Sequence, residues 1–443
     1  MEDNPSGNNE NPAQMNPHKA IVKNEHNKPK NISSITPGNE DSEVQKYYKD
    51  LEKEKEKEEK EKKEKEKKEK EKEKEKENNN SNNQKQNLNL DEAFSFKKYK
   101  KAPMVILENE ENTNYMNCVI QCLANNKSIA SYYLKNLDEF KHHIQDMPLT
   151  YAFSRIIFHL YPYPQDSLKK SFSLSGFHKA FVYMNPSFYG KDPKNPNEFL
   201  VYLLEALHEE DKKMSLHNNK NDKNNNNNSV FIEYIKYLNE YEKSCIFNNF
   251  CWINQKIKKC LQCNNDSTIY QNFFTYDLNF INVIKNKLEK NISVEDCLKF
   301  ISEKKEIEMY CNICNKRNKF IVENTINFSP NEIIFLIRGY NKIIKDKIKK
   351  ENFYFTYNNS INLNKYNKED KIIKSYSLNG FIAFDIREEE NMKYISYCLN
   401  PIDNKWYKYY DDNNVNKIQK IQDDFILKLE KILWPVILFY KQK

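Results

Sequence analysis

Four of the cysteines form two short pairs whose spacing suits a metal ion. Cys260 and Cys263 form one C-x₂-C pair, and Cys311 and Cys314 form the other. Each pair places two thiolates on one tight turn, and two such turns can complete the tetrahedral sulfur shell that Zn²⁺ prefers. A closed shell leaves no position for a reacting water, so the sequence predicts a structural zinc ion. Four reduced cysteines without a metal are the alternative.

Single cysteines and histidines are the other candidates for chemistry. Six cysteines lie singly among mostly apolar neighbours, as core residues do: Cys118, Cys122, Cys245, Cys251, Cys297 and Cys398. All 8 histidines lie at or before His217. The C-terminal half of the chain therefore offers no imidazole as a general base.

Composition restricts the class of protein. The chain has 443 residues, a formal net charge of +7, 10 cysteines and only 6 glycines. No apolar stretch approaches the roughly 20 residues that span a bilayer, and the first residues lack the features of a secretory signal. Cysteines in such a chain indicate a reducing compartment, so we expect an intracellular protein of the cytoplasm or nucleus. The positive charge is spread too thinly to form a compact basic stripe for nucleic acid.

The chain divides into a polar tail and a folded region. Residues 1–101 are rich in Asn, Lys, Glu and Pro, with too few apolar anchors to offset the entropy of ordering, so we expect a disordered tail. Within it, Glu52–Glu77 holds 13 Glu and 13 Lys and is interpreted as a solvated spacer or a partly helical, coiled-coil segment. Residues 102–443 are dense in apolar and aromatic side chains, interrupted by an Asn-rich insertion near 216–229.

The apolar periodicity indicates the elements that must position these residues. A helical stripe runs from Met116 to Leu123, with Thr113 or Asn114 as its expected N-cap. Further helices are expected over 199–207 and around 294–301. Five β-branched and aromatic runs predict strands: Ile333–Leu336, Gly380–Ile386, Tyr394–Leu399, Trp406–Tyr410 and Val436–Tyr440. Helices followed by an antiparallel sheet predict an α+β fold.

Several segments resemble ubiquitin-specific proteases, a family of ubiquitin carboxyl-terminal hydrolases. Residues 107–123 read LENEENTNYMNCVIQCL, which is similar to the family's first signature, G-L-x-N-x-G-N-T-C-Y-M-N-S-x-L-Q-x-L. Asn195–Glu209 resembles the family's Q-D-A-x-E-F-L…L-H box, and Asn400–Lys408 and Ile437–Lys441 resemble its last strands. The cysteine pairs lie between these segments, where the family has zinc-binding fingers. The resemblance extends over residues 102–443.

This resemblance implies a papain-like fold with a helical thumb, a β-rich palm and zinc-ribbon fingers at about 245–330. Active members use a cysteine nucleophile, a histidine base, an acid that orients the histidine, and an oxyanion donor. Carried onto this sequence, the four roles fall in that order on Asn114, Lys393, Asp411 or Asp412, and Asn109.

Two of these residues lack the chemistry of the family role. The neutral amide of Asn114 cannot attack an isopeptide carbonyl, and a charged Lys393 cannot accept a proton. Cys118 is the nearest alternative thiol, but it lies one helical turn deeper, about 6 Å along the axis, and follows the apolar stripe. Glu111 and Met392 replace glycines of the channel for the ubiquitin tail.

The sequence thus favours a catalytically inactive relative that binds ubiquitin or a protein partner as a scaffold. The resemblance implies ubiquitin-contacting roles for Asn195, Glu198 and Tyr394. The expected cofactor is structural zinc, and the expected partners are ubiquitin or a ubiquitinated protein, with other proteins bound through the tail. Nucleic acid and membrane partners are not expected. The alternatives are an active thiol-dependent deubiquitinase and a ribonucleoprotein or splicing-type adaptor.

Overall fold

A computed structural model describes most of the region that the sequence predicts to fold. The described residues are 105–109, 113–161, 171–190, 194–218, 230–286, 291–338, 354–366, 374–385, 393–412, 415–422 and 433–443. The predicted tail lies outside the described residues, as do Glu111, Met392 and most of the Asn-rich insertion.

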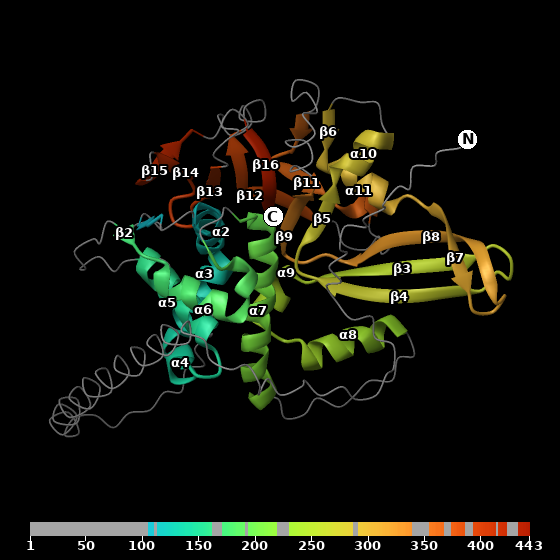
Figure 1. The fold of residues 1–443 in the computed structure, drawn as a ribbon, viewed down its shortest axis with the longest axis horizontal. Coiled ribbons are helices and arrows are strands. Elements are labelled where there is room, and N and C mark those ends of the chain that lie inside the picture. Colours follow the sequence, from blue (N-terminus) through green and yellow to red (C-terminus); the bar gives the residue numbers. More distant parts are fainter. Residues whose placement is uncertain are drawn as a thin grey trace, which may run out of the picture.

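The first part of the described chain is mainly helical and forms the thumb. Its helices are α2 (Asn114–Ala124), α3 (Lys127–Lys135), α4 (Leu137–His142), α5 (Pro148–Leu160), α6 (Ser175–Met184) and α7 (Pro196–Asn218). The helices predicted over 116–123 and 199–207 are confirmed as parts of α2 and α7. Two short strands, β1 (Ile106–Leu107) and β2 (Ser171–Phe172), pair in parallel beside them. Figure 1 shows this bundle in cyan and green, next to the red and orange strands of the palm.

Helix α2 begins without the side-chain cap that its sequence predicts. Thr113 occupies the N-cap position, but its side chain makes no capping hydrogen bond. Asn114 is the first helical residue, and its side chain bonds to another segment instead. Residues 115–124 are all buried, so packing rather than capping stabilises this helix.

The palm is an eight-stranded sheet built from the C-terminal part of the chain. Its strands are β5 (Tyr276–Asn279), β9 (Glu332–Arg338), β11 (Ser360–Asn362), β12 (Ser375–Asp385), β13 (Tyr394–Leu399), β14 (Trp406–Asp412), β15 (Val415–Ile421) and β16 (Leu433–Gln442). They follow the order β15-β14-β13-β12-β16-β9-β5, with β11 also paired to β12. All five predicted strands fall within β9, β12, β13, β14 and β16, except that Ile386 lies outside the described residues.

A second, four-stranded sheet extends away from the palm as the fingers, at the right of Figure 1. Its order is β4-β3-β8-β7, and all its pairs are antiparallel. The strands and the helices that precede them are α8 (Val230–Tyr241), α9 (Cys245–Phe250), β3 (Trp252–Cys260), β4 (Asp266–Phe273), β7 (Lys305–Cys311) and β8 (Lys316–Phe328). Shorter elements complete the described fold: η3 (Pro186–Phe188), α10 (Phe280–Asn286), β6 (Asn291–Ser293), α11 (Val294–Ser302), β10 (Tyr354–Thr356) and η5 (Asn364–Tyr366). Helix α11 confirms the helix predicted around 294–301.

The buried apolar residues form two separate cores. The main core joins the thumb to the palm, and Phe199 of α7 lies within it. The Phe199 ring centroid is 4.8 Å from that of Phe181 and 5.5 Å from that of Tyr115, in edge-to-face contacts typical of aromatic clusters. The second core, at the end of the fingers, has only four buried members, and two of them are the cysteines Cys260 and Cys311.

Helix α7 connects the thumb helices through two buried carboxylates. Glu210 accepts hydrogen bonds from the backbone N–H groups of Leu149 and Thr150, at 3.2 Å and 2.7 Å, at the start of α5. Asp211 accepts a hydrogen bond from the backbone N–H of Cys245 at the start of α9, and a second from the Tyr132 hydroxyl. Both carboxylates therefore satisfy N–H groups that the helices cannot pair internally.

Candidate active site and metal centre

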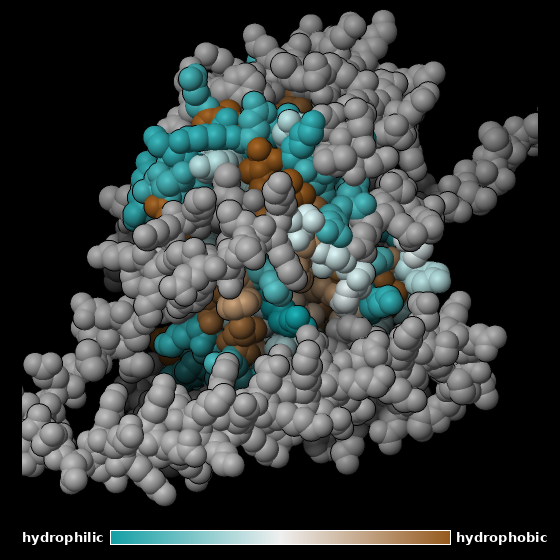
Figure 2. Space-filling view, turned by 90° about the vertical axis from the view of Figure 1, so that its left-hand side faces the viewer, coloured by the Kyte–Doolittle hydropathy of each residue, from teal (hydrophilic) through white to brown (hydrophobic). Residues whose placement is uncertain are grey.

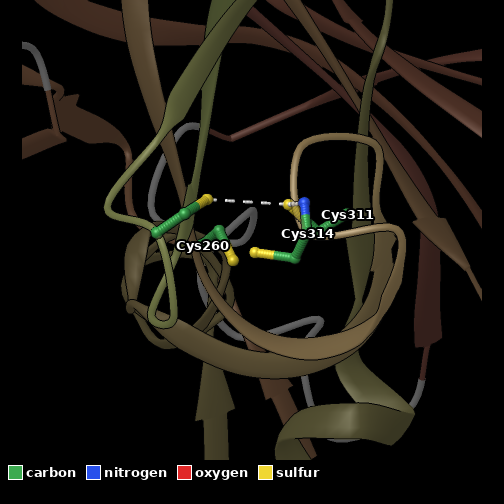
Figure 3. Close-up of side chains that lie close together, drawn as sticks. Cys260, Cys311 and Cys314 are labelled. Carbon is green, nitrogen blue, oxygen red and sulfur yellow. Dashed lines mark hydrogen bonds between the residues drawn. The ribbon is translucent and has the colours of Figure 1, made fainter.

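The two cysteine pairs meet at the end of the fingers. Cys260 and Cys263 lie at the turn between β3 and β4, and Cys311 and Cys314 lie at the turn between β7 and β8. The four sulfurs lie within 4.8 Å of one another, and the Sγ atoms of Cys263 and Cys311 are 3.7 Å apart. Figure 3 shows the sulfurs of both turns directed toward a common centre. The structure thus brings together the four predicted metal ligands.

Both cysteine turns end in the same backbone conformation. Asn264 follows the first pair with φ at 57°, and Asn315 follows the second with φ at 52°. These values lie in the left-handed region, which asparagine tolerates better than most residues with a side chain. Two N–H donors of the β7–β8 hairpin point at sulfur: Cys314 N donates to Cys311 Sγ at 3.5 Å, and Asn318 Nδ2 of β8 lies 3.7 Å from Cys260 Sγ.

The donor set fits zinc because four thiols this close cannot all ionise without a cation. Burial raises the pKa of Cys260, but the backbone N–H groups of Cys263 and Gln262 outweigh it and lower the pKa to about 6. Burial and hydrogen bonds with the neighbouring sulfurs raise the pKa of Cys314 to about 12. A central Zn²⁺ would stabilise all four thiolates together. The cluster could therefore hold a zinc ion, whose contribution would be structural.

The residue at the nucleophile position, Asn114, links α2 to the palm. Its Oδ1 accepts a hydrogen bond from the backbone N–H of Tyr394, at 2.7 Å, at the first residue of β13. Lys393 immediately precedes Tyr394, so the positions assigned to nucleophile and base do lie on facing segments. The Asn114 carboxamide is neutral, and its oxygen is already bonded to the backbone.

A polar group beside the Asn114–Tyr394 hydrogen bond consists of Lys393, Asp411 and Asn109. Asp411 Oδ1 lies 3.4 Å from Lys393 Nζ, and the side chain of Asp411 is only 1% exposed. Asp411 Oδ2 accepts a hydrogen bond from Asn109 Nδ2 at 2.5 Å. The acid of the family pattern is therefore bonded to the oxyanion donor and also paired with the lysine. Of the two candidate acids, only Asp411 has a described side chain.

Cys118 lies in the core, as predicted, and is a poor replacement for the nucleophile. Its side chain is 3% exposed. Burial raises the pKa of its thiol well above the ordinary value of 9.0, although a hydrogen bond with Ser396 lowers it. The groups that shift this pKa, within the described chain, include Cys398 and Asp411 but no histidine. The other five single cysteines are also buried, which confirms their predicted core positions.

The three residues predicted to contact ubiquitin differ in accessibility. Asn195 stands at the start of α7, where its Oδ1 accepts a hydrogen bond from the Asn197 backbone N–H at 2.9 Å. Glu198, in the first turn of α7, is exposed. Tyr394 is 2% exposed and packs in the main core. Ubiquitin contact through any of the three remains a prediction.

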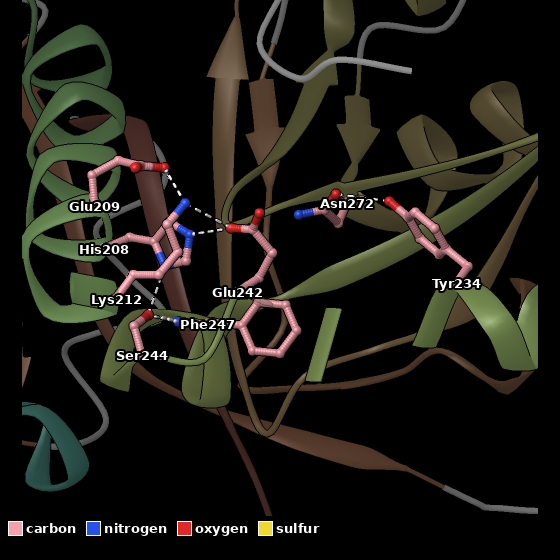
Figure 4. Close-up of polar contacts among 8 residues, drawn as sticks. All are labelled: His208, Glu209, Lys212, Tyr234, Glu242, Ser244, Phe247 and Asn272. Atoms are coloured by element: carbon pink, nitrogen blue, oxygen red, sulfur yellow. Dashed lines mark hydrogen bonds and ion pairs between the residues drawn. The ribbon is translucent and has the colours of Figure 1, made fainter. Parts of the chain in front are cut away.

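A histidine network that the sequence analysis did not single out lies on α7. His208 Nδ1 is 2.7 Å from Ser244 Oγ, and His208 Nε2 is 2.9 Å from Glu242 Oε2. Lys212 Nζ lies 2.7 Å from Glu209 Oε1 and 3.2 Å from Glu242 Oε2, as Figure 4 shows. The serine–histidine–glutamate order is that of a hydrolase triad.

The structure gives this network a structural role instead. Ser244 is 3% exposed, and its Oγ accepts the Phe247 backbone N–H at 2.9 Å as the N-cap of α9. The ammonium of Lys212 pairs with the carboxylates of both Glu209 and Glu242. The only sequence signal was the Leu207-His208-Glu209 step, which the family pattern already contains.

The fold and the sites define a papain-like protease domain of the ubiquitin-specific type. The family model described as "Ubiquitin carboxyl-terminal hydrolase" matches residues 105–440. The chain belongs to this family.

Known relatives and solved structures agree with that class. Ubiquitin carboxyl-terminal hydrolase 4 of Saccharomyces cerevisiae is 26% identical over 260 residues, covering 54% of this chain and 27% of the yeast protein. Ubiquitin carboxyl-terminal hydrolase 2 of Homo sapiens is 23% identical over 319 residues, covering 69% of this chain and 51% of the human protein. The chain thus spans about a quarter to a half of the length of these relatives.

Among solved structures, the SAGA DUB module of Ubp8, Sgf11, Sus1 and Sgf73, in a form bound to monoubiquitin, contains a chain of the same fold. The TM-score is 0.57 at 17% identity, with 78% of this chain and 70% of that chain covered. The same module bound to ubiquitin aldehyde gives a TM-score of 0.56, also at 17% identity. This likeness confirms the predicted α+β fold with thumb, palm and fingers.

The described residues include no membrane-spanning helix and no large apolar patch on the face shown in Figure 2. No helix within the described ranges combines the length and the apolar content needed to cross a bilayer. Figure 2 views the side that carries β2, β14 and β15, and its hydrophobic residues form small patches among hydrophilic ones.

Proposed function

We propose that this chain is a catalytically inactive member of the family that binds ubiquitin or a protein partner as a scaffold. The observation that carries the proposal is the pair of residues at the reacting positions, Asn114 and Lys393. Family activity needs a thiolate and a neutral imidazole at these two places.

The contacts of both residues support loss of the reaction. The Asn114 carboxamide has no basic lone pair, and its oxygen already accepts the N–H of Tyr394. Lys393 lies beside the buried carboxylate of Asp411, and an adjacent carboxylate favours the charged, non-basic form of a lysine. Asn109 donates to the same carboxylate, so a developing oxyanion would have to compete for this donor.

The fingers support retention of a binding role. The four-sulfur cluster is complete, and we propose that it holds a structural zinc ion that fixes the end of the fingers. Ubiquitin is present in the solved modules that share the fold. All ten cysteines are free, which agrees with a reducing, intracellular compartment such as the cytoplasm or nucleus.

Two measurements on the full chain test the proposal. We expect no turnover of a fluorogenic ubiquitin amide and no labelling by ubiquitin with a C-terminal electrophile, together with measurable binding of ubiquitin by calorimetry. Labelling that disappears in Cys118→Ser would establish an active thiol and contradict the inactive assignment. Absence of ubiquitin binding would contradict ubiquitin as the partner. The scaffold assignment itself would be contradicted if, in addition, no other protein were recovered with the chain and identified.

Restoration of the missing groups gives a sharper test. The double variant Asn114→Cys with Lys393→His should gain some hydrolysis, because Asn109 and Asp411 are retained. Asn114→Cys alone is the matched control, and we expect its rate to be about 10²-fold lower, since it lacks the general base. A silent double variant that still binds ubiquitin would indicate a second block at Glu111 and Met392.

A further inference from the structure

The end of the fingers exposes an apolar side chain at each of the two cysteine turns. Leu261 lies within the first C-x₂-C pair and is 45% exposed, and Ile313 lies within the second and is 65% exposed. Tyr310, which ends β7 together with Cys311, is 59% exposed. Because the four sulfurs of these turns lie within 4.8 Å of one another, all three side chains lie at the end of the fingers that is remote from the thumb (Figure 1).

The construction of the turns accounts for this exposure. The cysteine side chains occupy the space between the two turns, so the other side chains of each turn are left at the surface. The backbone fixes the position of Leu261, because its N–H donates to the carbonyl of Lys319 in β8 at 2.9 Å. Single exposed apolar side chains are common on protein surfaces. Here, however, three of them gather at one projecting end.

Basic side chains surround these apolar residues. Lys259 precedes the first cysteine turn, and Lys316 and Arg317 follow the second. All three are exposed, and none of them forms an ion pair with another described residue. Asp266 lies opposite Lys259 in the β3–β4 ladder, as an acid of the same end. The four strands of the fingers and their two cysteine turns together carry seven Lys or Arg and four Asp or Glu residues, so the excess charge is positive.

This combination fits the surface of an anionic bilayer better than a protein or a nucleic acid. A stable protein interface buries about 800 Å² on each partner around an apolar core, whereas this end offers two aliphatic side chains on turns. A nucleic acid would use the basic residues but not the aliphatic ones. At a bilayer surface, aliphatic side chains enter the acyl boundary, tyrosine lies at the headgroup level, and Lys or Arg attracts anionic lipids.

We propose that the end of the fingers docks reversibly on an anionic phospholipid membrane. Leu261 and Ile313 would enter the boundary between headgroups and acyl chains, and the three basic side chains would lie near the lipid phosphates. Such a peripheral contact needs no membrane-spanning segment. It leaves the thumb and the palm free, and it does not depend on the inactive groove or on ubiquitin binding.

Flotation of the full chain with lipid vesicles tests the proposal. We expect the chain to float with vesicles made of equal parts of phosphatidylcholine and phosphatidylserine, and to float little with vesicles of phosphatidylcholine alone. Added salt should weaken the binding, because it screens the attraction between basic side chains and anionic lipids. No flotation with the anionic vesicles, or equal flotation with both kinds, overturns the proposal. Retention of RNA without vesicle binding would assign the basic residues to nucleic acid and overturns it as well.

A variant of the two turns tests the apolar contribution. Leu261→Ser with Ile313→Ser keeps all four cysteines and should weaken binding to the anionic vesicles about tenfold or more, because it removes the side chains that enter the bilayer. Val230→Ser, on α8, is the matched control: Val230 is 69% exposed but lies away from the cysteine turns, so its replacement should leave binding unchanged.

Charge reversal tests the basic residues and separates them from the rest of the chain. Lys316→Glu with Arg317→Glu should weaken binding to the anionic vesicles about tenfold or more. Lys179→Glu with Lys405→Glu changes the net charge equally at exposed positions outside the fingers, and should have a much smaller effect. Native vesicle binding in both fingertip double variants would overturn the proposal. Circular dichroism and zinc content check that each variant is folded.

Discussion

The thumb and palm differ from the end of the fingers in what stabilises them. The first region buries a large apolar core in which Phe199 contacts a cluster of aromatic rings. The second buries only Cys260, Cys311, Phe320 and Val322, with three partly buried neighbours. So small a core cannot offset the entropy of ordering two turns. Burial therefore stabilises the first region, whereas the second depends on the metal–sulfur bonds that we propose.

Loss of the metal should have the largest effect on stability, and this effect should be confined to the fingers. Structural zinc in small modules contributes about 10–16 kcal/mol of apparent binding energy. We therefore expect Cys260→Ser to lose zinc by elemental analysis, and hydrogen exchange at Leu261 and Ile313 to become fast while β12 and β16 stay protected. Cys297→Ser, in the main core, is the control and should keep its zinc. Protected fingertip amides in metal-free protein would show that the small core suffices.

Truncation of an aromatic residue in each core should give the second effect. Phe199→Ala should lower the global free energy of unfolding by about 3–5 kcal/mol, because it leaves a cavity in the main core. Phe320→Ala, its counterpart in the fingers, should change the global transition far less while it loosens the zinc-binding end. Denaturant unfolding followed by circular dichroism measures both. Equal losses in the two variants would mean that the fingers and the palm unfold as one unit.

A pH dependence confined to the thumb should be the smallest effect. Burial raises the pKa of Glu210 above its ordinary value of 4.5, and the N–H groups of Thr150 and Leu149 oppose that shift only in part. A raised carboxyl pKa contributes stability that is complete below about pH 4.5 and is lost as the pH rises through the folded-state pKa.

Comparison of a glutamine variant with the native chain measures this contribution. As the pH rises from about 4.5 toward neutrality, Glu210→Gln should lose less stability than the native chain in urea titrations. Glu209→Gln, exposed on the same helix, should follow the native pH dependence. Parallel curves for all three proteins would exclude Glu210 as the source.

Much of the fold could be predicted from sequence, because the local residue pattern of these elements agrees with the structure that they adopt. The apolar stripes predicted α2, α7 and α11, and the aromatic runs predicted five palm strands. Thr113, one of the two residues predicted as N-cap of α2, does occupy that position, but neither it nor Asn114 caps the helix with its side chain, because Asn114 bonds to the distant Tyr394 instead. Such a long-range contact has no local signature in the sequence.

The site shows the same division between local and distant information. Cys260, Cys263, Cys311 and Cys314 could be predicted as one cluster because their spacing is itself the signal. The choice between Asp411 and Asp412 could not be made, because it depends on which side chain β14 directs toward Lys393 and Asn109. A cavity of about 390 Å³ between α7 and the base of the fingers could not be predicted, because elements far apart in the sequence line it.

Helix α7 has a consequence for motion. Asn197 Nδ2 donates to the Ile337 carbonyl of β9 at 3.3 Å, and Glu210 and Asp211 bond to α5, α3 and α9. Helix α7, which has 23 residues, thus connects the thumb to the palm sheet. We therefore expect the thumb and the palm to move as a single rigid body. Any change in the distance between the fingers and the rest of the domain, around a bound protein, must then come from bending of the fingers sheet. Such a collective motion occurs on the microsecond-to-millisecond timescale.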